Sequence, residues 1–88
     1  MGDPEILRAA FEEALENQLR DNNPPETAIT LRRLLSEGFS EEDTRKMILS
    51  CIATNIFDVV KNKDPEKASR EYIENLKNLP NAPFEEGW

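Results

Sequence analysis

The sequence contains no histidine, a single cysteine and only three glycines in 88 residues. Without histidine, the chain cannot assemble a Ser-His-Asp or Cys-His catalytic group, and the commonest transition-metal ligand is missing. The lone Cys51 permits neither an intramolecular disulfide nor a cysteine-rich zinc site, and it is typical of a cytoplasmic protein. The three glycines are too scattered for a phosphate-binding loop or a dinucleotide motif. We therefore predict no catalytic residue, no metal site and no cofactor.

Long apolar runs and net positive charge are lacking as well. No stretch of about 18 apolar residues occurs, and the N-terminus carries Asp3 and Glu5 where a signal peptide is basic. Eleven basic and 18 acidic side chains give a net charge of −7. This balance disfavours binding to nucleic acid or to an anionic membrane. We expect a cytoplasmic protein that binds neither.

The apolar residues that are present, 38% of the chain, are enough for one hydrophobic core. Proline and capping residues divide the chain into four segments with helical periodicity. Asp3 is the predicted N-cap of the first helix, and Pro4 takes the first helical position, where its missing N–H costs nothing. This helix is predicted to end near Arg20. Its buried face is predicted to comprise Ile6, Leu7, Ala10, Phe11, Ala14, Leu15 and Leu19.

The second segment follows an Asp-Asn-Asn-Pro-Pro turn, in which Pro24 disfavours the α conformation for Asn23. Asn23 and Glu26 have the spacing of a capping pair. The second helix is predicted over residues 24–37, and Gly38 supplies the left-handed residue at its end. Its predicted buried residues are Ala28, Leu31, Leu34 and Leu35.

The third segment is predicted to be the longest helix, from the N-cap Ser40 to about Asn62. Its apolar arc is wide, which is typical of a central helix contacted on two sides, while Ser50 falls in a narrow polar strip. The arc comprises Met47, Ile48, Leu49, Cys51, Ile52, Ala53, Ile56, Val59 and Val60. Asp64 and Pro65 open a fourth helix. Its narrower stripe is Ala68, Tyr72, Ile73, Leu76 and Leu79.

Short connections favour antiparallel neighbouring helices. We therefore predict an all-α fold, in which residues 1–79 form a compact four-helix bundle-like domain with a long central third helix. Residues 80–88 are predicted to be an extended C-terminal tail that contains proline. Its Phe84 and Trp88 either fold back over the fourth helix, remain disordered or dock into a groove of a partner.

Charge is distributed unevenly along the chain. Residues 1–44 contain 4 basic and 11 acidic side chains, whereas residues 45–88 contain 7 of each. The acids are consistent with a solvated face and favourable helix-dipole contacts, or with a negative surface that attracts a basic partner or a hard cation. They include Glu12, Glu13, Glu16, Glu37, Glu41, Glu42 and Asp43.

Two amides, Gln18 and Asn55, occupy positions where the helical periodicity favours apolar residues. A buried amide without partners costs about 1 to 3 kcal/mol, so both require hydrogen bonds. One interpretation is structural: Gln18 bonds the following turn and Asn55 fixes helix register. The other is a small polar pocket between the first and third helices, or a dimer contact at Asn55.

Two further residues have competing interpretations. Cys51 lies on the apolar arc and is predicted to be a small buried hydrophobe, because Arg45 and Lys46 lie on other faces. Ile29 is predicted to be exposed on the second helix, either as an isolated apolar residue or at the rim of an interface.

The order of these segments resembles a family of small helical prokaryotic proteins of unknown function. The shared pattern covers roughly residues 7–80 and lies in Gln18 to Leu19, Asp21 to Pro25, Leu31 to Gly38 and Tyr72 to Pro80. The resemblance implies the helical fold. Members of that family carry histidines on the first and third helices, where this chain has Glu13 and Lys46. A metal or acid–base role therefore does not transfer.

We predict a non-enzymatic helical module that binds protein, either a separate partner or a second copy of itself. Binding is expected through the wide apolar face of the third helix and the tail. The candidate interaction or structural residues are Gln18, Asn55, Ile29, Phe84 and Trp88. The alternative is a binder of small molecules or cations, with weak hydrolytic chemistry, that uses polar residues of the first and third helices.

Overall fold

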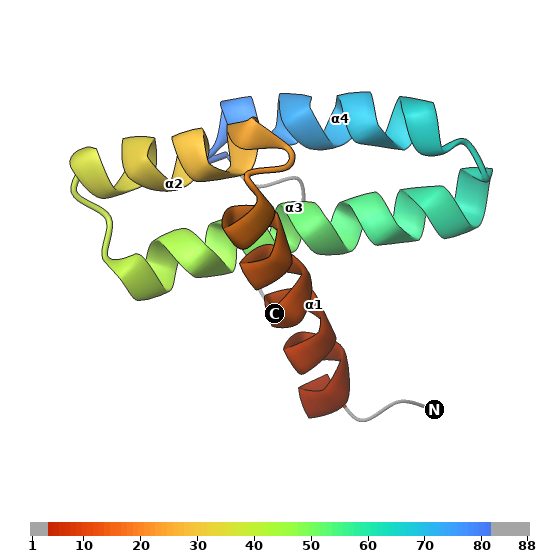
Figure 1. Ribbon diagram of the computed structural model, residues 1–88, viewed down its shortest axis with the longest axis horizontal. Coiled ribbons are helices and arrows are strands. Elements are labelled where there is room, and N and C mark those ends of the chain that lie inside the picture. The colour runs from red at the N-terminus through yellow and green to blue at the C-terminus, as the bar shows by residue number, and fades with distance from the viewer. Residues whose placement is uncertain (1–3, 82–88) are drawn as a thin grey trace.

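The computed structural model describes residues 4–81, and over that range it consists of helices and short connections (Figure 1). The prediction of an all-α, four-helix bundle-like domain with a long third helix is confirmed. The predicted cap Asp3 and the tail aromatics Phe84 and Trp88 lie outside the described residues. The helices are α1 (Pro4–Asp21), α2 (Pro25–Ser36), α3 (Glu41–Asn62) and α4 (Pro65–Asn78).

Side-chain caps begin two of the helices as predicted. The Ser40 hydroxyl accepts a hydrogen bond from the Asp43 backbone N–H at 3.0 Å at the start of α3. The Asp64 carboxylate accepts one from the Lys67 N–H at 3.2 Å at the start of α4. Each cap satisfies a backbone donor that has no partner within its helix.

Gly38 ends α2 with φ +104°, as predicted. The Gly38 N–H donates to the Leu35 carbonyl at 3.1 Å, and the Phe39 N–H donates to the Leu34 carbonyl at 3.2 Å. This pair of bonds is the Schellman motif, and it returns the half-buried Phe39 to the core.

The connection between α1 and α2 differs from the prediction. Asn22 adopts φ +52°, and the Asn23 N–H donates to the Gln18 carbonyl at 3.0 Å. The N-cap of α2 is Pro24, with no side-chain hydrogen bond, so the predicted capping role of Asn23 is wrong. The physical reason is that Asn22 and Asn23 terminate α1, while Pro25 removes one of the donors that a cap would satisfy.

The long helix α3 is central, as predicted. It contacts each of the other three helices, and α2 and α4 run antiparallel to it (Figure 1). Six consecutive residues, 48–53, are buried, which covers every side of the helix because one turn takes about 3.6 residues. The core around them contains Phe11, Leu15, Leu34, Ile48, Leu49, Cys51, Ile52, Ala53, Tyr72, Leu76 and Leu79.

Four burial predictions are wrong, and one concerns Ile56 and Val60 of α3: both were placed on the arc that neighbouring helices contact, but they are 37% and 69% exposed. On α2, Thr27 and Thr30 are buried and Leu35 is 40% exposed, because the inner face follows the spacing of Thr27, Thr30 and Leu34. Ser50 is buried rather than part of an exposed strip, since α3 is surrounded at that level. Finally, α1 crosses α3 steeply and continues beyond it (Figure 1), so residues 6–10 are exposed.

Candidate functional site

A buried polar cluster joins three helices. Gln18 comes from α1, Thr27 from the first turn of α2 and Tyr72 from the middle of α4. The Gln18 side-chain oxygen accepts hydrogen bonds from the Thr27 hydroxyl at 2.7 Å and from the Tyr72 hydroxyl at 2.8 Å. The two hydroxyl oxygens lie 3.0 Å apart. The Gln18 side chain was predicted to bond the turn that follows the first helix, but the partners that the structure shows are side chains of α2 and α4.

The protons of this cluster can be counted. Two hydroxyl protons serve three oxygen–oxygen contacts, and the Gln18 oxygen has two lone pairs with which to accept both. The contact between Thr27 and Tyr72 carries a proton only when one hydroxyl turns away from Gln18. Burial raises the pKa of Tyr72 to about 12, against the opposing effects of its hydrogen bonds to Thr27 and Gln18. The phenol thus stays protonated and acts as a hydrogen-bonding group rather than as a base.

Asn55 has a separate partner. Its side-chain amide donates to the Ala68 carbonyl at 3.0 Å and thereby joins α3 to α4. The structure thus places Gln18 and Asn55 in different contacts rather than in one pocket between α1 and α3. A second link to α4 comes from Arg33 of α2, whose guanidinium donates to the Leu76 carbonyl at 3.0 Å and to the Glu37 carboxylate at 3.1 Å.

Cys51 is fully buried in the core. Burial raises the pKa of its thiol to about 12, and the hydrogen bond with Ser50 lowers it only in part. A thiol with so high a pKa is almost entirely protonated at neutral pH, and the thiolate is the nucleophilic form. Cys51 therefore behaves as the small apolar residue that its position in the sequence predicts.

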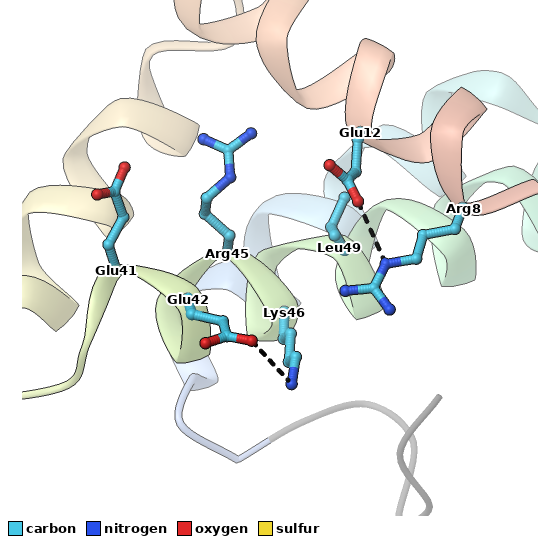
Figure 2. Close-up of a pocket in the computed structure, with 7 residues that line it drawn as sticks. All are labelled: Arg8, Glu12, Glu41, Glu42, Arg45, Lys46 and Leu49. Atoms are coloured by element: carbon cyan, nitrogen blue, oxygen red, sulfur yellow. Dashed lines mark hydrogen bonds and ion pairs between the residues drawn. The ribbon is translucent and has the colours of Figure 1, made fainter. Parts of the chain in front are cut away.

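A charged hollow of about 300 Å³ lies between α1 and the first turns of α3 (Figure 2). Its lining contains three cations, three carboxylates and one apolar side chain: Arg8, Arg45, Lys46, Glu12, Glu41, Glu42 and Leu49. Arg8 pairs with Glu12 at 3.2 Å and Lys46 pairs with Glu42 at 3.7 Å. Arg45 forms an ion pair with Glu16 of α1.

These ion pairs neutralise several of the acidic side chains found in residues 1–44. Glu12, Glu16 and Glu42 each face a basic residue, and Glu37 pairs with Arg33. No group of three side chains suited to holding a metal ion occurs in the part of the chain that the structure describes. The hollow is therefore a surface of paired charges rather than a concentrated negative field.

Most of the exposed large apolar side chains belong to two helices, α1 and α3. Seven large apolar side chains are exposed within the described range, and five of them lie on α1 and α3. We call these five the apolar corner: Ile6, Leu7, Ile56, Phe57 and Val60. Val60 is 69% exposed and Phe57 is 56% exposed, although residues 48–53 of the same helix are all buried. None of the four described helices combines the length and the apolar character needed to cross a bilayer.

The predicted interaction residues are thus dispersed. Ile29 is exposed on α2, as expected, whereas Phe84 and Trp88 lie outside the described residues. Ile56 and Val60 belong to the wide apolar face of the third helix through which binding was predicted. Ile6 and Leu7 were instead assigned to the buried face of the first helix, and Phe57 was assigned to neither face.

Comparison of the chain with protein-family models, with curated proteins and with solved structures gives no match. The resemblance to the small helical prokaryotic proteins stays a prediction.

Proposed function

We propose that the protein is a non-enzymatic protein-interaction module and that the apolar corner is its binding surface. Exposed apolar residues that occur singly are ordinary on protein surfaces, whereas Ile56, Phe57 and Val60 are neighbours at the spacing of three and four residues on one end of α3. The observation that carries the proposal is the change along α3. Leu49 and Ala53 are buried, whereas Ile56 and Val60, which continue the same helical stripe, are 37% and 69% exposed.

Two other features support binding rather than catalysis. In the polar cluster of Gln18, Thr27 and Tyr72, both hydroxyl protons have an acceptor within the cluster. The cations of the charged hollow all pair with carboxylates of the same chain. Both features are explained by contacts within the chain that stabilise the fold. The exposed side chains of the apolar corner are not explained in this way.

Two matched variants test this proposal. Val60→Glu places a charge in the apolar corner, and Ile29→Glu places one on α2, at a side chain that is 53% exposed. Light scattering reports self-association, and affinity capture from native cell extract reports other partners. We expect the unmodified chain to associate with itself or with a captured protein, Val60→Glu to lose that association, and Ile29→Glu to keep it.

Two results would contradict the proposal. One is a strict monomer that captures no protein that Val60→Glu fails to capture. The other is loss of binding in Ile29→Glu alone, which would move the binding surface to α2. Thermal unfolding checks that both variants fold, as expected for side chains that are more than half exposed.

The charged hollow favours a second candidate, a binder of small molecules, because its volume is at the lower limit of ligand pockets. Amide shifts in the presence of a metabolite panel test it. Shifts confined to α1 and the first turns of α3 would support it, and unchanged shifts throughout would remove it.

A further inference from the structure

Helix α1 is buried less than the other helices relative to its length. It has 18 residues, and its buried side chains in the described range are Phe11 and Leu15. The shorter helices α2 and α4 each contain three buried side chains. Residues 6–10 of α1 are exposed, where the helix continues beyond its crossing with α3 (Figure 1). The contacts that attach α1 to the other helices therefore lie mainly in its C-terminal half.

Polar contacts join this half of α1 to the other helices at two places, and neither strongly opposes its release. The Glu16 and Arg45 side chains, which form an ion pair, are 61% and 25% exposed, and exposed pairs contribute little to stability. Gln18 accepts hydrogen bonds from Thr27 and Tyr72, whose hydroxyl oxygens lie 3.0 Å apart. When Gln18 leaves, one hydroxyl can donate to the other, so this pair keeps a hydrogen bond between α2 and α4.

The connection between α1 and α2 permits such a release. The Asn23 N–H donates to the Gln18 carbonyl and ends α1, whereas the Thr27 N–H donates to the Pro24 carbonyl at 3.2 Å and begins α2. Within residues 4–81, no backbone hydrogen bond joins the chain before Pro24 to the chain after it. Pro24 and Pro25 have no N–H to donate. Helix α1 can therefore move about this connection without breaking a backbone hydrogen bond.

The other three helices keep their own contacts when α1 leaves. Arg33 of α2 bonds the Leu76 carbonyl of α4, and Asn55 of α3 bonds the Ala68 carbonyl of α4. The core residues other than Phe11 and Leu15 all lie in α2, α3 or α4 or directly after α4. Most of the hydrophobic core thus belongs to the part of the fold that does not include α1.

We propose that α1 is a detachable arm, which leaves the other three helices as one unit about the connection between Asn23 and Pro24. This partial opening requires less free energy than global unfolding, as is general for the less buried elements of a fold. It uncovers Leu49, which lies beside Arg8 and Glu12 of α1 (Figure 2) and is 5% exposed.

The opening gives α1 control over part of the α3 surface. Leu49 lies on the same helical stripe as the exposed Ile56 and Val60, seven and eleven residues further along α3. Release of α1 therefore lengthens the exposed apolar stripe towards the start of α3. The opening itself does not depend on the proposed function, whereas its effect on binding rests on it.

Hydrogen exchange of the full chain, followed by NMR in low concentrations of urea, tests the opening. A helix of 18 residues is only marginally stable by itself in water, so the amides of α1 exchange once it is released. We expect the amides of residues 16–19 to exchange at least tenfold faster than those of Ile52 and Ile73. They should also share one dependence on urea concentration, because they become exposed together.

Arg33→Ala separates the partial opening from global unfolding. The bond from Arg33 to the Leu76 carbonyl joins α2 to α4, so it stays intact in the partial opening and is lost on global unfolding. We expect exchange at Ile52 and Ile73 to become about fivefold faster, whereas residues 16–19 keep their rates. The matched control, Arg32→Ala at an exposed side chain of the same helix, is expected to change neither group.

Leu15→Ala distinguishes release of α1 from fraying of its turns. Leu15 is fully buried, so alanine removes packing that is lost only when α1 leaves the core. We expect residues 16–19 to exchange at least tenfold faster in this variant. Fraying without release predicts no acceleration, because alanine favours a helix at least as well as leucine. Far-UV circular dichroism checks the helix content, and Arg33→Ala decides the question if Leu15→Ala does not fold.

Two results would overturn the detachable arm. One is equal exchange in residues 16–19 and at Ile52 and Ile73, with equal acceleration of all of them by Arg33→Ala, which would make the four helices one cooperative unit. The other is unchanged exchange of residues 16–19 in a folded Leu15→Ala variant. Neither result bears on the binding lost in Val60→Glu, which is measured by light scattering and capture, so failure of the arm and failure of the proposed function are distinguishable.

Discussion

The hydroxyl oxygens of Thr27 and Tyr72 lie 3.0 Å apart, and both bond the side-chain oxygen of Gln18. Helices α1, α2 and α4 thus meet at one buried group of three oxygens. Thr27→Val replaces the hydroxyl with a methyl group of similar volume and leaves the phenol and the amide with one partner fewer. We expect the free energy of unfolding to fall by about 1 to 3 kcal/mol, measured by urea denaturation at neutral pH.

A matched control comes from Thr44, which is also fully buried but whose hydroxyl has no hydrogen-bond partner among the described residues. Thr44→Val removes a buried polar group that gains nothing in the fold, so we expect unchanged or increased stability, by up to about 1 kcal/mol. The two substitutions are chemically identical and should have opposite effects. Equal destabilisation by both would show that the cluster contributes nothing specific.

Arg33 forms a second hydrogen-bond contact between α2 and α4, in addition to that of Thr27 with Tyr72. Its guanidinium donates to the Leu76 carbonyl. Arg33→Ala is expected to lower the free energy of unfolding by about 1 kcal/mol, because that partly buried bond and the ion pair with Glu37 are lost. Arg32→Ala, at an exposed side chain of the same helix, is the control and should change stability by under about 0.5 kcal/mol. Equal midpoints in urea for the two variants would contradict the prediction.

Substitution of Gly38 tests whether its positive φ stabilises the end of α2, as the sequence predicted. A Cβ at this position would meet no other atom within 4 Å, so crowding adds nothing to the effect of a substitution. The φ of +104° is still unfavourable for a residue with a side chain. Gly38→Ala is therefore expected to cost about 1 kcal/mol, and Gly38→Asn less, because asparagine tolerates positive φ better. A larger loss for asparagine would exclude backbone strain as the cause.

The helices could be predicted from the sequence because their signals are local. Ser40, Asp64 and Gly38 act within one turn of their own position, and the structure uses each of them as expected. Asn23 was misassigned because the same residues suit the end of one helix and the start of the next. The hydrogen bond from the Asn23 N–H to the Gln18 carbonyl shows that Asn23 belongs to the end of α1 and not to the start of α2.

The surfaces could not be predicted in the same way, because they depend on how the helices cross. Periodicity places Leu7 and Val60 on apolar faces correctly. It does not show that α1 crosses α3 steeply (Figure 1), or that the two side chains are 48% and 69% exposed. The partners of Gln18 are likewise set by tertiary packing, since Tyr72 lies 54 residues away. A tyrosine in an apolar stripe does indicate that a buried hydrogen-bond partner exists.

Alkaline pH should destabilise the protein through Cys51 and Tyr72. Burial raises the pKa of each to about 12 in the folded chain, from ordinary values of 9.0 and 10.0. The folded state thus holds these protons more tightly than the unfolded state. The associated stability is complete below about pH 9 and is lost as the pH rises toward 12. The free energy of unfolding from urea titrations should fall by about 3 kcal/mol between pH 8 and pH 10.5.

Cys51→Ala separates the contribution of the thiol from that of the phenol. In the unfolded chain the thiol ionises before the phenol, so Cys51 accounts for most of the loss between pH 9 and pH 10. The variant is less stable at neutral pH, because it leaves a small cavity in the core. Its free energy of unfolding should nevertheless change less steeply over this range than that of the unmodified chain. An unchanged slope in Cys51→Ala would show that the thiol does not cause the alkaline destabilisation.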